Sequence, residues 1–185
     1  MANVDAPNGL KAVRHLTGGA VRTEEYKIAS GLSTAIFTGD CVKLLSTGYI
    51  DECDAGDRIL GVFAGCSYVN SSGEQVFSRQ WTASATTQGS VDVTAYVYSD
   101  PQIVFAVQSA GSADFADIGQ LADIVATAGD TNTGQSKHEI SGTTGTGTAG
   151  LRILRKYEEP NNAYGTNGVL EVQIYEHELT FATGV

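Results

Sequence analysis

Two of the three histidines of this 185-residue chain stand in patterns that begin a known zinc motif. His177 and Glu178 start an H-E-x-x-H sequence, but Phe181 stands where the second histidine ligand belongs. The stretch 138–142 starts the same motif and also lacks its second histidine. That chemistry needs both imidazoles on one face of a helix, and both stretches have the character of strand or loop. The sequence therefore predicts no metal site.

The densest acidic cluster covers residues 51–57, with the sequence DECDAGD. Calcium is bound by several carboxylate and carbonyl oxygens at fixed spacing. Cys53 and Ala55 stand where an EF-hand loop needs oxygen ligands. A solvated turn between two strands is the better interpretation of this cluster.

A G-x-G-x-x-G spacing occurs at residues 145–150. In dinucleotide-binding proteins these glycines join a buried strand to a helix whose N-terminus meets the pyrophosphate. Here the motif lies in a polar Ser/Thr/Gly loop, and the chain contains no strand–helix–strand pattern around it. We therefore predict no nucleotide cofactor, and none of any other kind.

Nucleophilic catalysis has little support in the sequence. Cys41, Cys53 and Cys66 are odd in number and form no C-x-x-C pair, so we expect reduced thiols and folding inside a cell. No G-x-S-x-G elbow is present, and nothing in the spacing of the three histidines shows that they converge. The chain is predicted not to be an enzyme and to have no catalytic residues.

Composition and charge exclude further classes. With 11 Lys+Arg and 21 Asp+Glu, the formal net charge is −10, which argues against binding along nucleic acid. No run of 18 apolar residues predicts a membrane span, and residues 1–7 do not have the character of a secretory signal. We expect a soluble acidic protein that contacts neither nucleic acid nor membrane.

Short alternating segments at close spacing predict that the chain is all-β. The predicted strands are 26–29, 35–37, 41–45, 49–50, 59–64, 66–69, 75–81, 91–98, 103–107, 151–154 and 169–176. The segments 35–37 and 41–45 are expected to flank a turn at Gly39 and Asp40, and 70–74 is a predicted hairpin loop. In the last strand, Leu170, Val172 and Ile174 fall on one face. This pattern favours a single jelly-roll or β-barrel-like domain, a β-sandwich or barrel over residues 25–185.

Two stretches are less regular. Residues 114–128 carry apolar residues at helical spacing, but Gly119 interrupts them. A short turn followed by a strand is favoured there, with one short helix as the alternative. The Gly/Thr-rich stretch 129–150 is predicted to be a loop, with a short strand at 138–140.

Residues 1–24 are predicted to form an extended N-terminal arm, because Pro and Gly interrupt any period. The arm concentrates positive charge in an otherwise acidic chain. Its basic residues are Lys11, Arg14 and Arg22, together with His15. Two interpretations stay open from the residues alone: a solvated, frayed terminus, or a strap that lies on an acidic partner surface.

Several short strings resemble the capsid decoration proteins, also called cement or head-stabilising proteins, of tailed bacteriophages. The strings lie at residues 1–10, 13–16, 26–30, 36–40, 42–44 and 58–63. The resemblance covers most of residues 1–110 and, more loosely, the rest.

The resemblance implies a structural virion protein that binds the outer surface of the capsid and ties adjacent major capsid protein subunits together. It implies self-association, commonly as a homotrimer and sometimes as a dimer, and synthesis in the cytoplasm of a bacterial host. Lys11, Arg14, His15 and Arg22 are the expected contacts of the arm with the capsid, because an arm that orders on binding needs charge-assisted anchors. Removal of residues 2–22 is then expected to leave a folded domain.

A carbohydrate-binding β-sandwich, either a receptor-binding or a lectin-like module, is the alternative from another class. Its candidate stacking platform consists of Tyr68, Trp81, Tyr96, Tyr98 and Tyr175. Aromatic residues in strand patterns more often pack in cores or between subunits.

Overall fold

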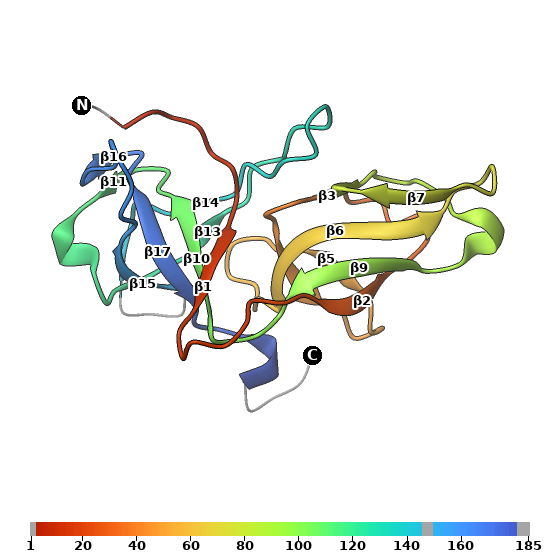
Figure 1. Cartoon of the computed structure of the whole chain (residues 1–185), viewed down its shortest axis with the longest axis horizontal. Coiled ribbons are helices and arrows are strands. Elements are labelled where there is room, and N and C mark those ends of the chain that lie inside the picture. The colour runs from red at the N-terminus through yellow and green to blue at the C-terminus, as the bar shows by residue number, and fades with distance from the viewer. Residues whose placement is uncertain (1–2, 146–149, 181–185) are drawn as a thin grey trace.

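The chain folds into antiparallel sheets, as the computed structural model shows for residues 3–145 and 150–180. About 44% of it is strand and 5% is helix, which confirms the all-β prediction. Two large sheets lie in two lobes side by side (Figure 1). Only single 3-10 turns interrupt the strands of the described part, η1 (Gln88–Ser90), η2 (Phe115–Asp117) and η3 (Glu178–Thr180). None of these helices is long and apolar enough to cross a membrane.

The five-stranded lobe is built on a sheet of order β1-β10-β17-β15-β12. Its strands are β1 (Lys11–His15), β10 (Ile103–Gln108), β17 (Val169–Ile174), β15 (Leu151–Lys156) and β12 (Leu121–Ala122). Two small sheets accompany it, β11 (Ser112–Ala113) with β16 (Gly165–Thr166), and β13 (Ile124–Val125) with β14 (Glu139–Ile140). Leu170, Val172 and Ile174 are buried on one face of β17, as their alternation predicts.

The six-stranded lobe has the sheet order β2-β9-β6-β4-β5, with β7 paired to the end of β6. Its strands are β2 (Glu24–Ile28), β9 (Val93–Tyr98), β6 (Gly61–Val69), β4 (Cys41–Leu44), β5 (Ile50–Glu52) and β7 (Gln75–Ser78). A two-stranded sheet of β3 (Ile36–Phe37) and β8 (Gln80–Trp81) covers it. The predicted hairpin loop at 70–74 is confirmed, because β6 and β7 pair with Val69 opposite Gln75.

Two apolar clusters form the core, and β4 and β6 contribute to both. Cys41 and Val62 pack into the cluster of the five-stranded lobe, whereas Val42 and Phe63 belong to the cluster of the six-stranded lobe. Strands buried on both faces have continuous apolar runs rather than alternation. This explains the unbroken apolar run at 59–64 and shows that the two lobes share strands at their junction.

The prediction that residues 1–24 form an arm is wrong for the middle of that segment. Lys11–His15 form β1, which pairs with β10 at the edge of the five-stranded sheet, and Leu10 is buried. Residues 3–10 are extended and lie along the molecular surface between β11–β16 and β1 (Figure 1). Because β1 belongs to a sheet, removal of residues 2–22 takes away an edge strand and a core residue. We therefore expect this truncation to destabilise the domain, whereas the sequence alone predicts a folded domain that has lost capsid binding.

The turn at Gly39 and Asp40 forms, but it does not join the two halves of one hairpin. β3 before it pairs with β8, and β4 after it pairs with β5 and β6. Gly39 has a φ of +100°, and an added Cβ would lie 3.0 Å from the Asn8 carbonyl oxygen. The chain approaches itself closely here, so the turn changes sheets instead of reversing direction within one.

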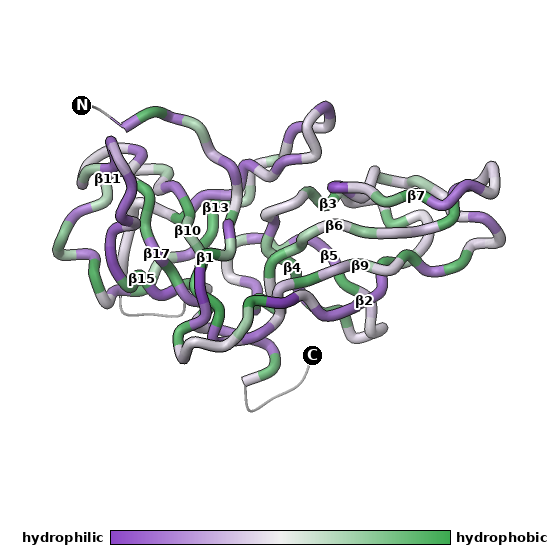
Figure 2. The backbone as a smooth tube through the Cα atoms, viewed as in Figure 1, coloured by the Kyte–Doolittle hydropathy of each residue, from purple (hydrophilic) through white to green (hydrophobic). Residues whose placement is uncertain are grey.

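The two irregular stretches resolve toward β structure. Residues 114–128 contain η2 followed by β12 and β13, so a short turn followed by strand is confirmed. The predicted short strand near residue 139 is β14. Figure 2 shows the preceding loop, near residue 132, as a largely hydrophilic projection between the lobes.

Candidate functional site

The four residues predicted to anchor the arm do not converge on one acceptor. Arg14 on β1 binds Glu171 through Nε at 3.1 Å and Nη2 at 2.8 Å. His15 Nε2 lies 3.1 Å from Asp100 Oδ2, and Arg22 Nε lies 3.4 Å from Glu24 Oε1. Arg14 and His15 are thus tied to their own lobe, whereas Arg22 and Glu24 are exposed.

Glu171 is a buried carboxylate held between two arginines. Arg14 comes from the edge strand β1, and Arg155 of β15 donates to the other carboxylate oxygen at 2.9 Å. Burial raises the pKa of Glu171, but the hydrogen bonds from Arg155 and Arg14 outweigh it and hold the pKa below its usual value. This cluster stabilises three strands of the sheet and is not a vacant anchor for a partner.

Lys11 lies at a groove between the lobes with a volume of about 450 Å³. The groove is lined by the apolar side chains Leu10, Phe63 and Tyr98 and by Lys11, Arg79 and Gln135. Arg79 Nη2 donates to Gln135 Oε1 at 2.5 Å, which ties the six-stranded lobe to the loop at 129–136. Two cationic side chains thus border one groove in an acidic protein.

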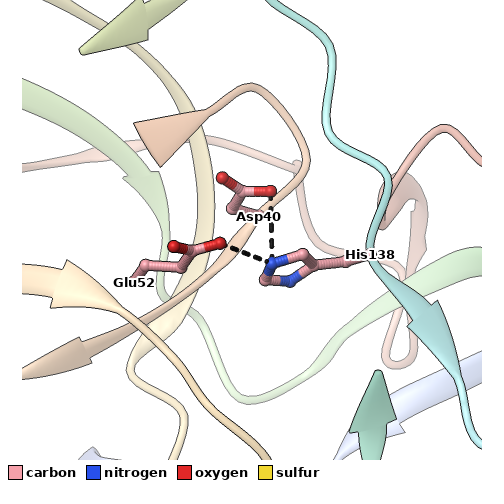
Figure 3. A group of neighbouring side chains, drawn as sticks. All are labelled: Asp40, Glu52 and His138. Atoms are coloured by element: carbon pink, nitrogen blue, oxygen red, sulfur yellow. Dashed lines mark hydrogen bonds and ion pairs between the residues drawn. The ribbon is translucent and has the colours of Figure 1, made fainter. Parts of the chain in front are cut away.

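A second polar cluster lies at the junction of the lobes and consists of Asp40, Glu52 and His138 (Figure 3). Asp40 lies in the turn before β4, Glu52 ends β5, and His138 immediately precedes β14. His138 Nε2 is 2.9 Å from Glu52 Oε1 and 3.4 Å from Asp40 Oδ1. One oxygen of each carboxylate and the imidazole nitrogen lie within 4.8 Å of one another. The cluster therefore brings His138 to two carboxylates that lie 86 residues or more before it in the chain.

Asp40 is fully buried, and its two oxygens have different surroundings. Oδ2 accepts a hydrogen bond of 2.6 Å from the Phe37 amide, whereas Oδ1 has no hydrogen-bond partner. Burial raises the pKa of Asp40 to about 6, although the nearby His138 and hydrogen bonds from the Ser136 side chain and the Phe37 amide lower it. A fully buried acceptor without a partner is uncommon in native proteins and calls for a physical explanation.

The hydrogen bonds of His138 define its tautomer. Nδ1 accepts from the Cys41 amide at 3.3 Å, so the proton of the neutral ring lies on Nε2 and is donated to Glu52. Glu52 retains 22% exposure of its side chain, and the other two side chains have none.

The remaining candidate nucleophiles and bases lie in the core. Burial raises the pKa of Cys41 and Cys53 well above the ordinary value, and it raises the pKa of Cys66 to about 12. Burial lowers the pKa of His177 to about 4. The three thiols are therefore protonated and His177 is neutral at pH 7, which suits packing better than attack on a substrate.

The other sequence motifs have simple structural roles where they are described. Within the acidic stretch 51–57, Lys43 Nζ lies 2.6 Å from Asp57 Oδ2, so a lysine compensates part of the negative charge of this turn. Glu52 from the same stretch instead reaches the junction cluster. The glycine motif at 145–150 lies mostly outside the described residues.

The five aromatic residues of the carbohydrate hypothesis do not share one face. Trp81 is fully buried, and Tyr68 meets it edge to face with ring centroids 5.5 Å apart. Tyr98 packs against the core of the five-stranded lobe, whereas Tyr175 is 44% exposed beneath the Arg152 guanidinium. These five residues form no common stacking platform.

Sequence reasoning missed the junction cluster because no local motif encodes it. Asp40, Glu52 and His138 come from three separate turns and strand ends, and only the folding of the two lobes brings them together. The available signal is a histidine directly before β14, in a segment that does not match the helical zinc motif. Comparisons with known proteins find no matching family model, no matching curated protein and no matching solved structure.

Proposed function

We propose that this chain is a structural virion protein of a tailed bacteriophage, which binds the outer surface of the capsid and cements adjacent major capsid protein subunits. The observation that carries the proposal is an extended N-terminal segment that ends beside an exposed aromatic pair. Phe115 and Tyr164 meet edge to face with centroids 6.0 Å apart, and they are 74% and 38% exposed. Aromatic side chains are enriched in the centres of protein interfaces, so this pair suits a protein partner.

The N-terminal segment is held to the body mainly by side-chain hydrogen bonds spread along its length. In its middle, Gln108 accepts from the Ala6 amide at 3.0 Å and donates to Asp5 at 3.1 Å. The Asn3 side chain donates to the Ala163 and Thr166 carbonyls at 2.9 and 2.8 Å. At the other end, the Leu10 amide donates to the Gly39 carbonyl at 2.9 Å. Val4 next to Asn3 is 77% exposed. Such a segment can exchange side-chain anchors on its own body for contacts with a neighbouring subunit while β1 stays in its sheet.

The proposal includes the partners that the family resemblance implies. The major capsid protein is the proposed partner, self-association as a homotrimer or a dimer is expected, and neither nucleic acid nor membrane is required. The chain acts without catalysis. Its place is the virion exterior after synthesis in the bacterial cytoplasm.

The experiment measures binding of the purified chain to capsids of the phage that encodes it, prepared without this protein. Deletion of residues 3–8 and the double variant Phe115→Ser/Tyr164→Ser are each expected to weaken binding at least tenfold while the melting transition stays cooperative. Phe77→Ser is the matched control, because Phe77 is 76% exposed on β7 of the other lobe. Unchanged binding by both test variants contradicts the proposed surface. Binding to a glycan array without binding to capsids favours the carbohydrate-binding alternative.

A further inference from the structure

The junction cluster has the ligand types and spacing of a metal site. We propose that Asp40, Glu52 and His138 bind one divalent first-row transition cation, of which zinc is the best representative. The inference does not depend on the proposed capsid role. It rests on the unpartnered Asp40 oxygen, the separations of the three ligand atoms and the placement of His138 between two carboxylates.

The distances between the ligand atoms fit a small cation. Zinc binds histidine nitrogen and carboxylate oxygen at about 2.0–2.2 Å, which in a tetrahedral site separates neighbouring ligand atoms by roughly 3.3 Å. His138 Nε2 lies 2.9 Å from Glu52 Oε1 and 3.4 Å from Asp40 Oδ1. These two separations differ from that value by a few tenths of an ångström, and the two carboxylate oxygens lie within 4.8 Å of each other. Three protein ligands leave a fourth position for water on the side where Glu52 is partly exposed.

The unpartnered Asp40 oxygen points to the same ligand. Oδ1 is buried without a hydrogen bond and faces the imidazole nitrogen (Figure 3). Two carboxylates share one imidazole here, and a buried carboxylate needs a hydrogen-bonded partner or a counterion. No arginine or lysine reaches these three side chains in the ion pairs of the described residues. A bound cation would give Asp40 Oδ1 a partner and would also compensate the negative charge of the two carboxylates.

The donor set favours transition metals over calcium and magnesium. An imidazole ligand suits zinc, copper, iron and nickel, whereas calcium takes six to eight oxygens and magnesium prefers an octahedron of oxygens. The cluster offers one nitrogen and two carboxylates from rigid positions. Asp40 is fixed by the Phe37 amide, and the chain around it is fixed by contact between Gly39 and Gly9.

Metal binding at Nε2 requires a change of tautomer. The proton now on Nε2 moves to Nδ1 when Nε2 donates its lone pair to the cation, so the ring stays neutral. Nδ1–H then faces the Cys41 N–H, so the 3.3 Å hydrogen bond is lost and the imidazole must move away from that amide. Binding must exceed this cost, and the proton shift gives a direct spectroscopic signature of the proposed site.

The first test uses the full chain, stripped with a chelator and titrated with Zn²⁺. We expect one ion per chain and a higher melting temperature, with no comparable effect of Ca²⁺ or Mg²⁺. Glu52→Gln is expected to lower Zn²⁺ affinity at least tenfold. His15→Gln is the matched control, because His15 also lies against a carboxylate, but only one, that of Asp100. Equal Zn²⁺ affinity in the wild type and in folded Glu52→Gln overturns the proposal.

The second test needs no variant and so does not depend on the folding of one. Nitrogen–proton NMR of the histidine side chains should show one imidazole, assigned to His138, shifting its proton from Nε2 to Nδ1 as Zn²⁺ is added. Co²⁺ should give the visible absorption of a four- or five-coordinate site with one equivalent. Failure of Zn²⁺ to move the His138 proton overturns the proposal and leaves the cluster as a hydrogen-bonded contact between the lobes.

Discussion

Glu171 and Asp40 are both buried carboxylates, but the protein surrounds them in opposite ways. Glu171 lies on the outer face of the five-stranded sheet between Arg14 and Arg155, which are permanent cations. Asp40 lies at the junction of the lobes beside a second carboxylate and one imidazole, with no arginine or lysine in its ion pairs within the described residues. The pKa of Glu171 is accordingly lowered, whereas burial raises the pKa of Asp40 to about 6.

The difference separates a structural cluster from a candidate binding site. Buried charge is stable where the fold supplies its partner, and its pKa shift then favours the charged form. Where no fixed partner is supplied, the charge must be removed by a proton or compensated by a ligand. The Glu171 cluster belongs to the first class, and the junction cluster to the second.

The largest expected effect comes from placing a carboxylate one residue away from Glu171, on the opposite face of the strand. Leu170 is 2% exposed in the core. Leu170→Asp buries a charge without a partner and is expected to cost about 3–5 kcal/mol, enough to unfold the domain or nearly so. Chemical denaturation followed by circular dichroism measures this, with Gln173→Asp on the outer face as the control. A wild-type melting transition in Leu170→Asp would contradict the assignment of the strand faces.

His177 adds a third case to the comparison of Glu171 and Asp40, a buried ionisable group that is neutral in the folded protein. Burial lowers its pKa to about 4 from an ordinary 6.5. Between these two values the unfolded chain binds a proton at His177 that the folded chain does not bind. Stability from this group is complete above pH 6.5 and is lost as the pH falls toward 4, by at most about 3 kcal/mol. His177→Gln should flatten the stability profile over that window. An unchanged acid limb in the variant would show that His177 is not the responsible group.

Removing the negative charge from each carboxylate cluster should have unequal effects. Glu171→Gln weakens charge-assisted hydrogen bonds from two arginines and is expected to cost about 2 kcal/mol at pH 7. The wild type should lose this advantage as the pH falls below 4.5, because the folded pKa is lowered. Asp40→Asn, measured with a chelator present, should change stability by less than about 1 kcal/mol, since it removes an uncompensated charge. Equal losses in the two variants would contradict the comparison.

Much of the fold follows from the sequence, because strand periodicity is a local property. β17 and the β6–β7 hairpin could be predicted from alternation and turn residues alone. The sheet to which each strand belongs could not be predicted, since two strands that are adjacent in sequence need not pair with each other. β3 and β4 flank one turn but belong to different sheets, and β1 joins β10 across about 90 residues. Such pairing depends on long-range burial, which a local pattern does not contain.

The functional sites were less predictable than the fold. The charge of the N-terminal segment is visible in the sequence, but the buried acceptor of Arg14 lies 157 residues away on β17. The junction cluster combines residues 40, 52 and 138, and none of its spacings matches a metal motif. Only the tight contact of two turns and one loop makes these side chains neighbours.

The smallest expected effect on stability comes from Arg22. Its exposed ion pair extends the comparison of buried carboxylates to a charged pair in solvent. Arg22 and Glu24 form an exposed pair at 3.4 Å, with side chains 76% and 57% exposed, so solvent screens their attraction. Arg22→Glu should change the free energy of unfolding by less than about 0.5 kcal/mol, measured by denaturation in parallel with Glu171→Gln. Because Arg22 is the most exposed of the predicted anchors that are paired, the same variant should weaken capsid binding, more so at low salt. Full capsid binding by Arg22→Glu at low salt would remove Arg22 from the proposed contact surface.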